Sequence, residues 1–88
     1  MIETATYRLA RGIRLRREAD GSVLMLVPEG IVTLNDTAYA ALELADGERS
    51  IAAIASVLDA RFDAPDGALE TDVADLFEDF AARGYLLR

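Results

Sequence analysis

The sequence predicts a small α+β domain of the winged helix-turn-helix type, with an N-terminal three-stranded antiparallel sheet followed by three helices. Two observations favour this class. Apolar and polar residues alternate early in the chain, whereas apolar residues recur at helical spacing in three later segments. Gly, Pro, Asp and Asn residues separate these segments. With 88 residues, we expect one domain over residues 1–88, built around one modest core.

Two strands and a hairpin turn are expected first. Apolar residues alternate with arginine over residues 11–18, which is typical of a half-buried strand. Asp20 and Gly21 then predict a tight hairpin turn, with positive φ tolerated at both positions. Residues 22–27 are apolar on both faces, which favours a strand with neighbours on both edges. We therefore expect this second strand in the middle of a meander, with the third strand at its edge.

The third expected strand consists of Ile31, Val32, Thr33 and Leu34. Pro28 and Gly30 precede it, and its β-branched residues favour an extended backbone. The strand contains no Lys, no Pro and no charge, although these are the usual devices that stop an edge strand from pairing with another chain. We therefore expect this edge to be either covered or used for binding.

Apolar periodicity predicts three helices, at residues 35–45, 51–62 and 68–83. Asn35 and Ser50 are suitable N-caps for the first two helices. Gly47 and Gly84 follow the first and third helices and favour their termination. The turn-forming residues 63–67 should break the second helix. The short apolar tail after Gly84 is expected to close back on the sheet or the helices.

The composition excludes several kinds of chemistry. The chain contains no Cys and no His, which removes thiol and imidazole catalysis, disulfides and the ligand sets of ordinary zinc and iron–sulfur sites. No glycine-rich phosphate-binding motif occurs. The longest apolar runs, such as residues 23–27, are far shorter than the roughly 20 residues of a membrane helix. We expect a cytoplasmic, non-enzymatic protein with no cofactor, no metal and no membrane partner.

The charge is distributed unevenly along the chain. Residues 1–17 contain five Arg against Glu3 alone, about +4, whereas the remainder contains four Arg against fifteen acidic residues, about −11. Such a basic stripe could contact phosphate or an acidic partner. A solvated strand face balanced by acidic residues elsewhere is the simpler interpretation, and we expect it here.

Three acidic residues, Asp72, Asp75 and Asp79, share one face of the third expected helix. A catalytic pair would need carboxylates in differing environments within a pocket, and hard cations usually draw ligands from several elements. We therefore interpret these residues as a solvated or partner-facing acidic surface. In a winged helix the same residues would repel DNA phosphates, so we expect no nucleic-acid partner, although binding through the N-terminal arginines stays a rival hypothesis.

An interaction module is the interpretation that remains. An extended peptide could pair with the edge at residues 31–34 while its side chains enter a groove beside the third helix. Of Val73, Leu76, Phe77 and Phe80, at least three should belong to the core, so that one or two line the groove. The acidic surface would favour a peptide with basic residues beside its apolar anchors. A homodimer that pairs through the same edge is a further alternative.

Several short motifs, taken in their order and spacing, resemble those of the PqqD family, the peptide chaperones of pyrroloquinoline quinone (PQQ) biosynthesis. The motifs are residues 12–16, 23–30, 34–38, 44–47, 50–54, Asp72-Val73 and residues 84–87. Together they cover nearly the whole chain. Arg11 is a departure, since relatives often have Pro before the following glycine.

The resemblance implies a RiPP recognition element, which binds the leader of a ribosomally synthesised, PqqA-like precursor peptide and presents it to a PqqE-like radical SAM enzyme. It implies that the peptide binds as an added strand between the third strand and the third helix. The implied contacts are Ile31, Val32, Thr33 and Leu34 on the strand and Asp72, Val73, Asp75 and Leu76 on the helix. The PQQ pathway is the expectation, with lasso-peptide or other radical SAM peptide pathways as alternatives.

Overall fold

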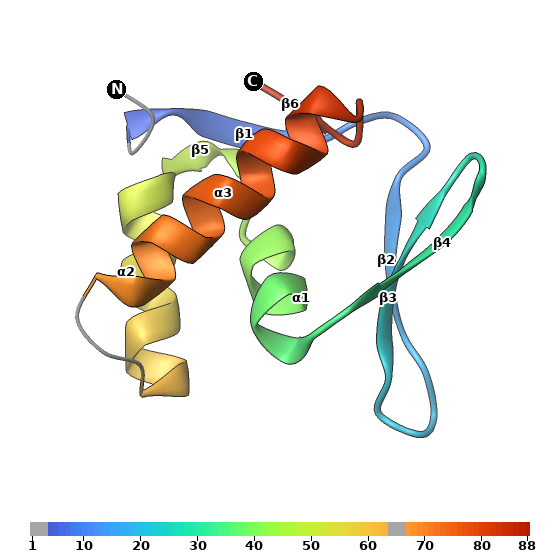
Figure 1. Ribbon diagram of the computed structural model, residues 1–88, viewed down its shortest axis with the longest axis horizontal. Helices are drawn as coiled ribbons and strands as arrows, with labels where there is room; N and C mark the ends of the chain where they lie inside the picture. Colours follow the sequence, from blue (N-terminus) through green and yellow to red (C-terminus); the bar gives the residue numbers. More distant parts are fainter. Residues whose placement is uncertain (1–3, 64–66) are drawn as a thin grey trace.

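A computed structural model describes residues 4–63 and 67–88 of the chain (Figure 1). The strands and helices, in chain order, are β1 (Thr6–Leu9), β2 (Arg14–Arg17), β3 (Val23–Val27), β4 (Gly30–Leu34), α1 (Asp36–Glu43), β5 (Asp46–Ser50), α2 (Ile51–Phe62), α3 (Ala68–Ala82) and β6 (Leu86–Leu87). The strands form two antiparallel sheets, in the orders β2-β3-β4 and β5-β1-β6. Figure 1 shows the first sheet projecting to one side of the three helices.

The sheet β2-β3-β4 is the predicted meander, and β3 is its middle strand as expected. Val23 and Met25 of β3 are buried, and Leu15 of β2 packs against the same core. Because side chains alternate between the faces of a strand, these residues define the face of the sheet that is turned toward the helices. The sheet meets the helices mainly through α1.

The turn between β2 and β3 differs from the predicted one. Gly21 has a φ of 93°, but Asp20 does not adopt positive φ. The N–H of Glu18 donates to the carbonyl of Ser22 at 2.8 Å, so the connection has three residues, with glycine at its left-handed position. The Asp20 carboxylate accepts hydrogen bonds from the hydroxyl and the N–H of Ser22, which hold the pKa of Asp20 below its ordinary value.

The helices begin where their caps predict. The N–H of Ala38 donates to Asn35 Oδ1 at 2.7 Å, and the N–H of Ala53 donates to Ser50 Oγ at 3.1 Å. Of the predicted break at residues 63–67, residues 64–66 lie outside the described residues. Asp63 and Gly67 on either side have positive φ, 48° and 79°.

The prediction for the end of the first helix was wrong. Helix α1 stops at Glu43, and its C-cap Leu44 has an ordinary φ of −89°. Gly47 does not terminate the helix, because it lies within β5, where it has a φ of 82°. The positive φ is what favours glycine at this position, since an added Cβ would meet the Arg8 side chain at an ordinary contact distance of 3.7 Å.

The sheet β5-β1-β6 was not predicted, apart from the expectation that the C-terminal tail closes back. Its central strand β1 contributes Tyr7, which is 1% exposed and contacts Phe77 of α3 edge-to-face at 5.4 Å between ring centroids. The Tyr7 hydroxyl has no hydrogen-bond partner within residues 4–63 and 67–88. Packing of the ring, rather than a hydrogen bond of its hydroxyl, therefore holds Tyr7 in the core, and the guanidinium of Arg88 lies over the same ring at 5.5 Å from its centroid.

Helix α3 ends in a Schellman motif at Gly84, the residue that was predicted to terminate it. The N–H of Tyr85 donates to the carbonyl of Phe80 at 2.9 Å, and the N–H of Gly84 donates to that of Ala81 at 3.0 Å. The rings of Phe80 and Tyr85 meet edge-to-face at 5.6 Å. With a φ of 85° at Gly84, the chain reverses and enters β6 beside β1.

Replacement of Gly84 with Ala should destabilise the domain by about 1–2 kcal/mol, because a Cβ is unfavourable at this positive φ. Urea unfolding followed by circular dichroism measures the change. Gly84→Asn is the control. It should lose less stability than the Ala variant, because Asn tolerates the left-handed conformation better than Ala does. Equal stability of the Ala variant and the wild type would contradict this account of the helix end.

Candidate functional site

Strand β4 has one open edge: it pairs with β3 on one side and with no other strand of the described chain on the other. The direction of its backbone groups follows from the hairpin before it. The carbonyl of Ser22 accepts a hydrogen bond from the N–H of Glu18, which directly follows β2, so the backbone of Ser22 points toward β2. Because bonding direction alternates along an antiparallel strand, Val23, Met25 and Val27 then bond toward β4.

This alternation shows which backbone groups of β4 are open. Val32 is paired with Met25, and Leu34 with Val23, so the N–H and C=O groups of both residues point toward β3. The N–H and C=O groups of Ile31 and Thr33 therefore point away from the sheet. Of residues 31–34, which were all expected to contact the peptide backbone, only Ile31 and Thr33 have outward backbone groups. Val32 and Leu34 direct their side chains to the core.

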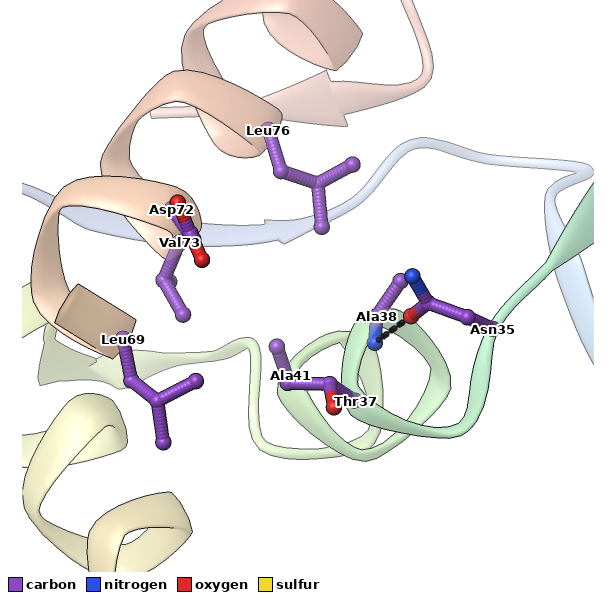
Figure 2. Close-up of a pocket in the computed structure, with 8 residues that line it drawn as sticks. All are labelled: Asn35, Thr37, Ala38, Ala41, Leu69, Asp72, Val73 and Leu76. Atoms are coloured by element: carbon purple, nitrogen blue, oxygen red, sulfur yellow. Dashed lines mark hydrogen bonds between the residues drawn. The ribbon is translucent and has the colours of Figure 1, made fainter. Parts of the chain in front are cut away.

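A pocket of about 280 Å³ lies between α1 and α3 (Figure 2). Its lining consists of Asn35, Thr37, Ala38, Ala41, Leu69, Asp72, Val73 and Leu76. In Figure 2 the apolar side chains of α3 point toward the two alanines of α1. Ala38 and Ala41 are three residues apart and share one face of α1, where their small side chains leave room opposite α3. The pocket starts where β4 ends, because Asn35 directly follows Leu34.

The structure places the predicted α3 residues in two groups. Asp72, Val73 and Leu76 come together at the pocket, whereas Asp75 is exposed and is not part of its lining. Val73 is buried and Leu76 is half-buried. Of the four apolar residues considered for the groove, Phe77 and Phe80 are buried in the core and do not line the pocket. This division agrees with the expectation that only one or two of the four are available.

The pocket residues on α1 and Leu69 were missed by the sequence analysis. The nearest signal in the sequence is the pair of small residues Ala38 and Ala41 directly after a cap that follows the open strand. The apolar periodicity of this segment predicts a helix with one buried face and gives no sign of a pocket. Because facing helices normally pack without voids, this pair of alanines does not by itself predict a pocket.

The acidic surface of α3 is exposed to solvent. Asp72 stands at the pocket, and Asp79 forms an ion pair with Arg83 at 3.0 Å. Within residues 4–63 and 67–88, no three acidic side chains are grouped closely enough to hold a metal ion. None of the helices in that part of the chain combines the length and the apolar character needed to cross a membrane. The site therefore offers an open strand edge, an apolar pocket and a carboxylate beside it.

Comparison with known sequences gives several close relatives. A "PqqA binding protein" of Klebsiella pneumoniae (strain 342) is 42% identical over 79 residues, which is 89% of this chain and 85% of the relative. A protein of the same name from Azotobacter vinelandii is 44% identical over 80 residues, 90% of this chain and 86% of the relative. The "bifunctional coenzyme PQQ synthesis protein C/D" of Methylorubrum extorquens is 35% identical over 92% of this chain and 22% of its own length.

A solved structure has the same fold. The solution structure of the PqqD truncation of Methylobacterium extorquens PqqCD, described as a functional and stand-alone RiPP recognition element, superposes with a TM-score of 0.80 at 33% identity. The match covers 100% of both chains, and it confirms the predicted fold class. Residues 22–86 also match the family model described as coenzyme PQQ synthesis protein D. The chain therefore belongs to the PqqD family.

Proposed function

We propose that this chain is a non-enzymatic, cytoplasmic peptide chaperone of PQQ biosynthesis. It binds the leader of a PqqA-like precursor peptide as a strand added to β4 and presents the peptide to a radical SAM enzyme. The observation that carries this proposal is the position of the open edge of β4 directly beside the pocket between α1 and α3. The names of the relatives, "PqqA binding protein", support the identity of the peptide.

The backbone of the peptide bonds to the open edge of β4. Ile31 and Thr33 each offer one N–H and one C=O, so an added strand gains up to four hydrogen bonds. Each contributes about 0.5–1.5 kcal/mol net. These bonds do not depend on the peptide sequence, and they fix only its path and register.

Side chains of the peptide supply the selectivity. In an added strand, residues opposite Val32 and Leu34 turn to the same face as these two core-packed side chains, toward α3. One apolar side chain of the peptide can enter the pocket, where its full burial contributes about 1.5–3 kcal/mol. Asp72 at the pocket favours a basic residue beside this anchor and disfavours an acidic one.

A proline at Thr33 tests the backbone contacts. Thr33→Pro removes an outward N–H and leaves the pairing with β3 intact, since an edge strand tolerates proline where its N–H faces solvent. We expect the dissociation constant for synthetic precursor peptide, measured by isothermal titration calorimetry, to rise about tenfold or more. The helical circular dichroism should be unchanged.

Thr33→Val is the matched control for this experiment, because it changes the side chain and keeps the N–H. It should bind the peptide nearly as tightly as the wild type does. Unaltered peptide affinity in a folded Thr33→Pro variant would place the peptide elsewhere on the domain.

Filling the pocket tests the side-chain contacts. Ala38→Leu places a larger apolar side chain in the space that the peptide anchor would occupy, so the affinity for the precursor peptide should fall about tenfold or more. Amide signals of the free protein should keep their dispersion in NMR spectra, because leucine is a good helix former.

Ala53→Leu is the control for Ala38→Leu, because both alanines stand three residues after an N-cap to which they donate. Ala53 is exposed on α2, away from the pocket. The control should bind the peptide like the wild type. An equal loss in both variants would show that the effect is not due to the pocket.

A further inference from the structure

The outer face of the sheet β2-β3-β4, turned away from the helices, has an apolar centre. Leu24 and Leu26 of β3 are half-buried, yet within the described chain they belong neither to the core nor to the side chains packed on it. Ile31 lies directly opposite Leu26 and is 64% exposed. It is the most exposed of the large apolar side chains in that part of the chain, ahead of Leu87 at 41% and Val57 at 37%.

Two arginines of β2 border this apolar centre. Arg14 is paired with Leu26 and Arg16 with Leu24, so all four side chains share the outer face. Arg14 forms no ion pair with any residue in the described ranges, and Arg16 is 3.4 Å from Glu18 in a solvent-exposed pair. The face thus combines positive charge with exposed apolar surface in a chain whose net charge is −7.

A peptide strand added to β4 would extend this face. Peptide residues opposite Ile31 and Thr33 would direct their side chains to the same side as these two residues, away from the pocket. The rows that begin at Arg14 and Arg16, cross the two leucines and reach Ile31 and Thr33 would then continue onto the peptide. Such a surface contains side chains of both the chaperone and its guest.

We infer that this outer face, defined by Arg14, Arg16, Leu24, Leu26 and Ile31, is the docking surface for the peptide-modifying enzyme. The inference rests on the proposed function. The enzyme surface that fits it has an apolar centre with carboxylates placed against the two arginines. A second copy of the chain is the rival occupant of this face, and the experiment below distinguishes it from the enzyme.

Reversal of one charge on this face tests the inference. Arg14→Glu should weaken binding of the purified radical SAM enzyme of the pathway to the peptide-loaded chain by about tenfold or more, because it sets like charges against each other. Its affinity for the precursor peptide should stay within about twofold of the wild type, since Arg14 lies two strands away from the open edge. Biolayer interferometry measures the first affinity and calorimetry the second.

Arg61→Glu is the matched control. Arg61 is exposed at the end of α2, lacks an ion pair among the described residues, and its reversal changes the net charge by the same amount. Enzyme binding should weaken for Arg14→Glu as stated above and stay near the wild-type affinity for Arg61→Glu. Equal enzyme affinity of Arg14→Glu and the wild type would overturn the inference, and so would equal losses in both variants.

Two further results separate this inference from the proposed function. If the wild-type chain does not bind the precursor peptide, the proposed function fails, while the affinity of the enzyme for the free chain still tests the outer face. If sedimentation shows a wild-type dimer that Arg14→Glu dissociates, the face is a contact between copies, and the enzyme-docking inference is overturned.

Discussion

Helix α3 is held in place by a sheet on the side remote from the pocket. Tyr7 of β1 contacts Phe77, and α2 and β6 pack along the same helix. The Schellman motif at Gly84 makes this possible, because it turns the chain back so that β6 can pair with β1. Phe77 and Phe80 are buried in the core and do not line the pocket, whereas Val73, which is also a core residue, and half-buried Leu76 do. Strands β1 and β6 contribute no residue to the pocket lining, yet they position the helix that forms one wall of the pocket.

The elements that were predictable carry long or repeated signals. The meander follows from alternation and from the apolar run of β3, and the helices follow from periodicity bounded by Asn35, Ser50 and Gly84. The open edge was predictable because its lack of protective residues is visible in the sequence. The sequence did not predict which residues of β4 point their backbone groups outward. This depends on the three-residue turn before β3, which determines which residues of β3 bond to β2 and which bond to β4.

The second sheet escaped prediction because its strands carry little sequence signal. Strand β6 has two residues, and β5 contains no large apolar residue. Local bonds stabilise β5 instead: the Asp46 carboxylate accepts the N–H groups of Glu48 and Arg49, both at 2.9 Å, and the Arg49 guanidinium at 2.7 Å. These contacts hold the pKa of Asp46 below its ordinary value. The α1 side of the pocket was missed for a related reason, since alanines indicate a helix without indicating space beside it.

One geometric property of a strand links the open edge, the pocket and the outer face. Along β4, each residue whose backbone points toward a guest has its side chain on the outer face, as Ile31 and Thr33 do. Each residue whose backbone points toward β3 has its side chain toward the core, as Val32 does. A guest strand must follow the same alternation, and a shift by one residue would exchange its two faces. Its pocket-facing residues can therefore determine affinity, while its outward residues remain accessible to a second protein.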